Sequence, residues 1–117
     1  MMKENIDLQP IRVPTGWAIS INNFFNIDPV DEYIDYFYSS VLISGDSKLM
    51  GLSFDSRYEP EGVPNGDFIL VMQKNEYNKK GMVINADVID IIKTKERHIF
   101  TKCLEYFMKE GGKLPFN

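Results

Sequence analysis

A single long helical pattern near the C-terminus, preceded mainly by strand-length apolar runs, is the feature that most limits how this chain can fold. Between Thr94 and Gly111-Gly112, apolar residues recur at the spacing of one helix face: Ile99, Phe100, Cys103, Leu104 and Phe107. The spacing predicts an amphipathic helix of about four turns that Thr94 caps and the glycine pair ends. Its apolar face has to be buried against another element, and the preceding runs predict a sheet.

The runs before this helix have the length and residue types of β-strands. Valine, isoleucine and aromatic residues are frequent in them, and glycine, proline, asparagine or aspartate separates them. We expect loops at 57–66 and 75–81. The expected strands are Trp17–Ile21, a hairpin of Val41–Ile43 and Leu49–Phe54 around the turn Ser44–Ser47, a central strand at 67–74, and a strand at 82–91 that could bend near Asn85-Ala86.

A shorter helix is predicted to begin at Asp28-Pro29. Aspartate is a favourable N-cap residue, and proline fits the first helical position. An apolar stripe follows at helical spacing, formed by Val30, Tyr33, Ile34 and Phe37. We therefore expect a helix of about two to three turns, on which Asp31 and Asp35 share one exposed face because they lie four residues apart.

These elements predict an α+β fold: an antiparallel sheet of about five strands, with the short acidic helix and the C-terminal amphipathic helix packed on one face. The chain has 117 residues and a mass of 13.5 kDa, which suits a single domain over residues 1–117. Its hydrophobic content of 44% is too high for an intrinsically disordered chain, so a packed core is expected.

Charge and cysteine content restrict the partners and the compartment. Seventeen carboxylates exceed thirteen cations, and the formal charge of −4 argues against a direct nucleic-acid partner, which would require a cationic face. No apolar run is long enough to span a membrane, and the N-terminus lacks the apolar stretch of a signal peptide. The lone Cys103 excludes an intramolecular disulfide and a thiolate metal site. We expect a cytoplasmic protein; a homo-oligomer is possible but nothing indicates one.

Few residues could support catalysis. His98, the only histidine, is expected at the solvated start of the C-terminal helix, and Cys103 is expected in the core. No glycine-rich phosphate loop occurs. We therefore expect no catalytic, cofactor or metal site, and a protein that is not an enzyme. One alternative stays open, a small hydrolase or ligand-binding protein that uses Asp55 with Glu59 or Glu61.

The distribution of charge favours protein binding. No lysine or arginine lies between Arg12 and Lys48, whereas this stretch holds five carboxylates and three closely spaced tyrosines: Asp28, Asp31, Glu32, Asp35 and Asp46, with Tyr33, Tyr36 and Tyr38. Carboxylates would speed the encounter with a cationic partner, and aromatic side chains would anchor the complex. The alternative is a capped helix with a solvated acidic face and tyrosines in the core.

Two segments resemble small bacterial immunity proteins of polymorphic and contact-dependent growth-inhibition toxin systems. The first is Pro14-Thr15-Gly16-Trp17-Ala18-Ile19 followed by Asn22-Asn23-Phe24. The second runs from Leu52 to Leu70 and includes Asp55, Tyr58-Glu59-Pro60-Glu61-Gly62 and Pro64-Asn65-Gly66-Asp67-Phe68. Together they cover about half of the chain, and their shared features are turn and strand signatures.

The resemblance implies a non-catalytic inhibitor that binds the C-terminal domain of a cognate toxin, for which a cationic nuclease would suit the acidic chain. We expect the contact residues to be Asp31, Glu32, Asp35, Asp55, Tyr58, Glu59 and Glu61, with Tyr33 or Tyr36 beside them. A structural or oligomeric adaptor is a further alternative, using the edge of the Phe68–Met72 strand or the basic C-terminal helix.

Overall fold

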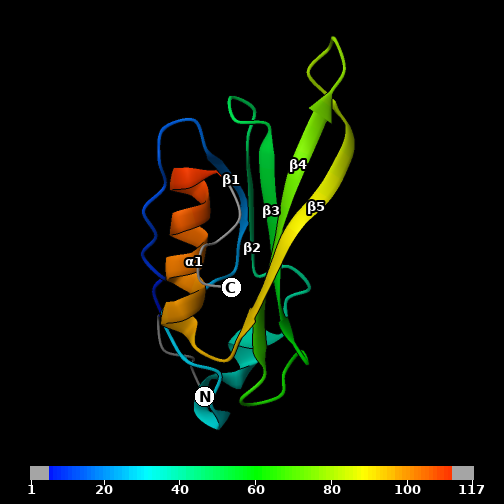
Figure 1. Ribbon diagram of the computed structural model, residues 1–117. Coiled ribbons are helices and arrows are strands. Elements are labelled where there is room, and N and C mark those ends of the chain that lie inside the picture. Colours follow the sequence, from blue (N-terminus) through cyan, green and yellow to red (C-terminus); the bar gives the residue numbers. More distant parts are fainter. Residues whose placement is uncertain (1–5, 112–117) are drawn as a thin grey trace.

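One antiparallel sheet and one α-helix organise the protein, which we describe over residues 6–111 of a computed structural model (Figure 1). The strands lie side by side in chain order, β1-β2-β3-β4-β5. The predicted α+β fold with five strands is confirmed. The elements are β1 (Ala18–Asn22), the 3-10 helix η1 (Asp31–Phe37), β2 (Ile43–Ser47), β3 (Leu52–Glu59), β4 (Asp67–Tyr77), β5 (Val83–Thr94) and α1 (Arg97–Glu110).

Helix α1 packs on one face of the sheet, and four of the five residues of its predicted apolar stripe enter the core. The fifth, Ile99, is 37% exposed. Phe100, Cys103, Leu104 and Phe107 are all at most 1% exposed. The helix ends at Gly111, whose φ of 70° is the left-handed conformation that favours glycine. Thr94 does not cap it: Glu96 holds the N-cap position, and the Thr94 hydroxyl accepts a bond from the Glu96 amide instead.

Phe68 of β4 joins the parts of the core. Its ring lies 5.5–6.1 Å from four other rings: Tyr58 of β3, Phe24 before the 3-10 helix, Phe37 of η1 and Phe100 of α1. Tilted and edge-to-face contacts at these distances stabilise a core beyond the area that they bury. One side chain therefore fixes α1 and η1 to the same sheet.

The turn predicted at Ser44–Ser47 is wrong, because these residues belong to β2 and the turn follows at 48–51. At Gly45 a Cβ atom would lie 2.6 Å from the Ala18 carbonyl oxygen and 3.0 Å from the Phe54 ring. The glycine lies within β2 and, because it has no side chain, lets the β1 main chain and the Phe54 ring lie close to the β2 main chain. The buried Ser47 hydroxyl accepts a bond from the Met50 amide and supports the later turn.

The acidic helix also differs from the prediction. It is a 3-10 helix that begins at Asp31, and Asp28 lies outside it, with Val30 at the N-cap position. The Asp28 carboxylate does not cap the helix because Arg97 binds it, at 3.0 Å between Nε and Oδ1. A contact across the fold thus overrides the local capping signal.

The β4–β5 hairpin is longer than predicted. Strand β4 continues to Tyr77, so the expected loop at 75–81 shrinks to a turn in which the Asn78 side chain accepts bonds from the amides of Lys80 and Met82. The register of β5 against β4 shifts where Ile84 and Ile89 have no partner in β4. The first shift lies next to the bend predicted at Asn85-Ala86. In residues 6–111, no helix is long and apolar enough to cross a membrane.

Gly45→Ala should lower the free energy of unfolding by about 1–3 kcal/mol, because a main-chain oxygen has to move to admit the methyl group. Urea denaturation followed by circular dichroism measures the change. Ser44→Ala, on the adjacent half-buried position of β2, is the matched control and should change stability by less than about 0.5 kcal/mol. Equal stability of the two variants would contradict the close-approach explanation.

Candidate acidic binding surface

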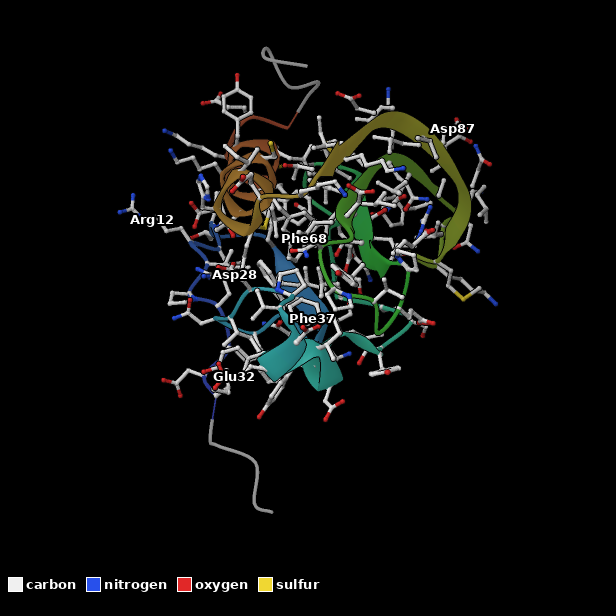
Figure 2. The ribbon with its side chains drawn as sticks, turned by 90° about the horizontal axis from the view of Figure 1, so that it is seen from below. Arg12, Asp28, Glu32, Phe37, Phe68 and Asp87 are labelled. Carbon is white, nitrogen blue, oxygen red and sulfur yellow. The ribbon has the colours of Figure 1, made fainter. Side chains whose placement is uncertain are left out.

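The 3-10 geometry of η1 decides which of its side chains are exposed. With about three residues per turn, positions i and i+3 align. Accordingly Glu32 and Asp35, three residues apart, are both exposed. Phe37 is buried and points into the core, whereas Glu32 lies at the outside of the molecule (Figure 2). The sequence paired Asp31 with Asp35 on the spacing of an α-helix, whereas in the 3-10 helix it is Glu32 that aligns with Asp35. Asp31 is also exposed, at the start of the helix.

The loop that follows β3 packs against η1. The Gly62 amide donates to the Phe37 carbonyl at 2.8 Å, and the Asn65 amide donates to the Pro29 carbonyl at 3.0 Å. The Tyr38 ring covers Gly62 so closely that a Cβ atom there would lie 2.3 Å from it. These contacts pack the loop that carries the exposed Glu61 against η1, so two acidic segments that are distant in sequence lie at one end of the molecule.

Tyr58 is part of the core, and the prediction that it contacts a partner is wrong. Its side chain is 1% exposed and packs on Phe37 and Phe68. Its hydroxyl donates to the Val63 carbonyl and accepts a bond from the Gly66 amide at 2.6 Å. The role of Tyr58 is therefore to hold the loop at 60–65 against the sheet.

Burial raises the pKa of the Tyr58 hydroxyl above its usual value near 10. The bond from Gly66 opposes this shift, and the negative charge of Asp67 adds to it. The folded protein thus favours the neutral hydroxyl, which can donate to Val63 as the deprotonated form cannot.

Two of the predicted contact carboxylates, Glu59 and Asp55, do not lie free beside the carboxylates of η1. Glu59 forms an ion pair with Arg57 on β3. Asp55 projects from the same strand on the sheet face opposite α1, opposite Val71 of β4, and its Oδ1 accepts a bond from the Ser56 amide. The structure therefore does not group Asp55 with η1.

Four exposed carboxylates remain, and we call them the acidic surface: Asp31, Glu32, Asp35 and Glu61. Among residues 6–111, none of the four forms an ion pair. Exposed apolar groups lie on the same segments, with Tyr38 60%, Val63 46% and Val30 42% exposed. The sequence analysis placed Tyr38 in this acidic stretch, expected Val30 on the apolar stripe of the helix, and did not single out Val63.

A shallow hollow of about 360 Å³ adjoins the acidic surface. It is lined by Ser40, Arg57, Tyr58, Glu59, Pro60 and Glu61. Its two carboxylates, Glu59 and Glu61, are both exposed, and Arg57 binds Glu59. The hollow therefore lacks the buried carboxyl group that a general acid–base pair of carboxylates requires. No group of three or more histidine, cysteine, aspartate or glutamate residues in the described part of the chain could hold a metal ion.

His98 and Cys103 lie where the sequence predicts. His98 is exposed in the first turn of α1, with Nδ1 3.7 Å from a carboxylate oxygen of Glu96. Cys103 is 1% exposed in the core, and burial raises the pKa of its thiol. The two side chains therefore do not form a nucleophile and base pair.

Comparison with known proteins adds no identification. No family model, curated protein or solved structure matches this chain. The resemblance to immunity proteins stays a prediction from the residues.

Tyr58→Phe should destabilise the protein by about 1–3 kcal/mol near neutral pH, because the buried Gly66 amide loses its acceptor. A raised folded-state pKa gives stabilisation that is full below the unfolded value near 10 and is lost as pH rises through the folded value. The wild type should therefore lose stability at alkaline pH more steeply than Tyr58→Phe. Urea denaturation between about pH 7 and pH 11 checks this.

The matched control is Tyr38→Phe, which removes an exposed hydroxyl and should change stability by less than about 0.5 kcal/mol. If Tyr58→Phe followed the wild-type pH profile, Tyr58 would not be the group whose titration weakens the fold.

Proposed function

We propose that this chain is a non-catalytic immunity-type protein that binds a cationic toxin domain in the cytoplasm and covers its active or substrate-binding surface. The observation that carries the proposal is the acidic surface, where four exposed carboxylates lack an ion pair among residues 6–111. The resemblance of two segments to immunity proteins points to the same class of partner.

The charge of the acidic surface supports a cationic partner. This surface holds four exposed carboxylates of a chain whose formal charge is −4. A concentrated charge raises the rate of encounter with an oppositely charged protein, and the effect weakens with salt because the Debye length is about 8 Å at physiological ionic strength.

The backbone of the acidic surface supports tight rather than only fast binding. Main-chain bonds from Gly62 and Asn65 hold the loop on η1, and Phe37 anchors η1 in the core. The surface is therefore ordered before a partner arrives, which lowers the entropy lost on binding. Tyr38, the most exposed of these apolar groups, can supply a desolvated contact among the charges.

A cationic nuclease domain fits this surface chemically. Such a domain binds phosphates through lysine and arginine, and carboxylates at similar spacing can occupy the same cations. Inhibition then requires no reaction by this chain, because the substrate and the acidic surface exclude each other.

Glu32→Lys/Asp35→Lys should weaken binding by about 100-fold or more at low salt, because it places like charges against the partner's cations. Isothermal titration calorimetry measures this with an inactivated C-terminal domain of the large protein that we expect to be encoded directly upstream. Glu76→Lys/Glu110→Lys makes the same charge change at exposed positions outside the acidic surface and should retain the wild-type affinity. Equal loss in both variants, or no binding by the wild type, would reject the proposal.

The carboxylates of the acidic surface and the Tyr38 ring should affect different rate constants of toxin binding. Glu32→Gln/Asp35→Asn should lower the association rate constant by about tenfold at low salt, because it removes steering. Tyr38→Ala should mainly raise the dissociation rate constant, by about fivefold or more, because it removes a desolvated contact. Surface plasmon resonance at two salt concentrations separates the two effects, and salt-independent association would contradict electrostatic steering.

A further inference from the structure

The loop at 60–66 connects two internal strands of the sheet. β4 lies between β3 and β5, so the adaptor hypothesis that used the edge of its Phe68–Met72 run is wrong. β3 and β4 pair up to the base of the loop, where Glu59 faces Asp67. The loop is therefore anchored at both ends, and its main-chain bonds to η1 hold it from outside the sheet.

A side-chain hydroxyl closes the last turn of this loop, at 63–66. In many β-turns the first carbonyl accepts a hydrogen bond from the fourth amide. Here the buried Tyr58 hydroxyl connects these two groups, because it donates to the Val63 carbonyl and accepts from the Gly66 amide at 2.6 Å. The Gly66 nitrogen is therefore held by a side-chain oxygen of β3.

The geometry of the turn restricts its last two residues. Asn65 has a φ of 59°, the left-handed conformation that asparagine tolerates better than most other residues do. At Gly66 a Cβ atom would collide with the Glu59 carbonyl oxygen and lie 2.8 Å from the Tyr58 hydroxyl. Only glycine fits there without a main-chain shift, so the fold places an asparagine directly before an obligatory glycine.

An asparagine before a glycine is chemically reactive. The glycine amide nitrogen can attack the side-chain carbonyl carbon of the asparagine, because glycine has no Cβ atom to hinder the approach and its main chain is the most adaptable. Asn65-Gly66 is the only such pair in the sequence. Asn65 is exposed, so water can reach the group that the attack produces.

We propose that Asn65-Gly66 is a site of spontaneous deamidation, and that the Tyr58 hydroxyl controls its rate by holding the Gly66 amide. In the reaction a bond forms between the Gly66 nitrogen and Asn65 Cγ, and the bond between Cγ and Nδ2 breaks. The Gly66 amide proton is transferred to the leaving Nδ2, which departs as ammonia, and a cyclic imide remains. Water then opens the imide at either carbonyl, so one water is consumed and nothing is oxidised or reduced.

The two products change the protein in different ways. Opening the imide at Cγ gives an aspartate, which adds a carboxylate to the exposed loop that packs on η1. Opening it at the former main-chain carbonyl gives an isoaspartate, whose main chain gains a methylene group. The longer main chain should displace the Gly66 amide from the Tyr58 hydroxyl, so this product should loosen the turn.

The hydrogen bond from Gly66 to Tyr58 determines how often the reaction can start. The attack requires the Gly66 nitrogen to lose its proton and to turn toward Asn65 Cγ, and neither is possible while it donates to Tyr58. Opening the bond leaves a buried amide without its acceptor, which should slow the reaction by about 10–100-fold relative to the unfolded chain. If global unfolding were the only route, the reaction would be slower by more than about 1,000-fold.

Mass spectrometry of the full-length wild type during incubation at physiological temperature follows conversion of the Asn65 amide to a carboxyl group. The folded protein should react about 10–100-fold more slowly than the same protein in concentrated urea. Asn85, which is exposed and precedes Ala86, is an internal control that should react more slowly than Asn65 in urea. Equal rates in the folded and unfolded protein, or a ratio above about 1,000-fold, would overturn the proposal.

Tyr58→Phe removes the hydroxyl that holds the Gly66 amide and should raise the rate in the folded protein by about tenfold. Gly45→Ala is the matched control, because it should destabilise the fold to a similar extent while the Tyr58 hydroxyl stays in place. It should react at the wild-type rate. No acceleration in Tyr58→Phe, or equal acceleration in both variants, would overturn control by the hydroxyl. Neither measurement needs a partner, so the result is independent of the proposed inhibition.

Discussion

The aromatic contacts of Phe68 are the constraint on which the other features depend. This ring is fully buried in β4 and meets rings from α1, from η1 and from β3. Because interiors are packed as densely as organic crystals, these elements cannot shift independently. The helix on one face of the sheet and the acidic segment at its end are therefore positioned by the same cluster.

The acidic surface follows from this constraint. Phe37 turns into the cluster, which directs Glu32 and Asp35 outward, and Tyr58 holds the neighbouring loop through its buried hydroxyl. Apolar packing and main-chain hydrogen bonds thus position these carboxylates, and no ion pair among the described residues is needed to do so. The proposed cationic partner would meet carboxylates that the fold already holds in place, which lowers the entropy lost on binding.

Sequence reasoning succeeded where local pattern and tertiary packing agree, and failed where a distant contact intervened. Four of the five residues of the α1 stripe, Cys103 among them, and the central strand were predicted correctly because burial of one face follows from spacing, whereas Ile99 at the margin of the stripe is exposed. Asp28 was expected to cap a helix, and Arg97 bound it instead. Gly45 was assigned to a turn, although it permits close contact between strands.

The sequence by itself determined the α+β class, the C-terminal helix and an acidic segment without lysine or arginine, because these follow from periodicity and composition. Only the tertiary structure decided that the loop of Glu61 packs against η1, that Tyr58 is buried, and that β5 rather than β4 is an exposed edge. The physical reason is that hydrogen bonds and ring contacts between residues far apart in the chain set these positions, and no local pattern encodes which distant groups will meet.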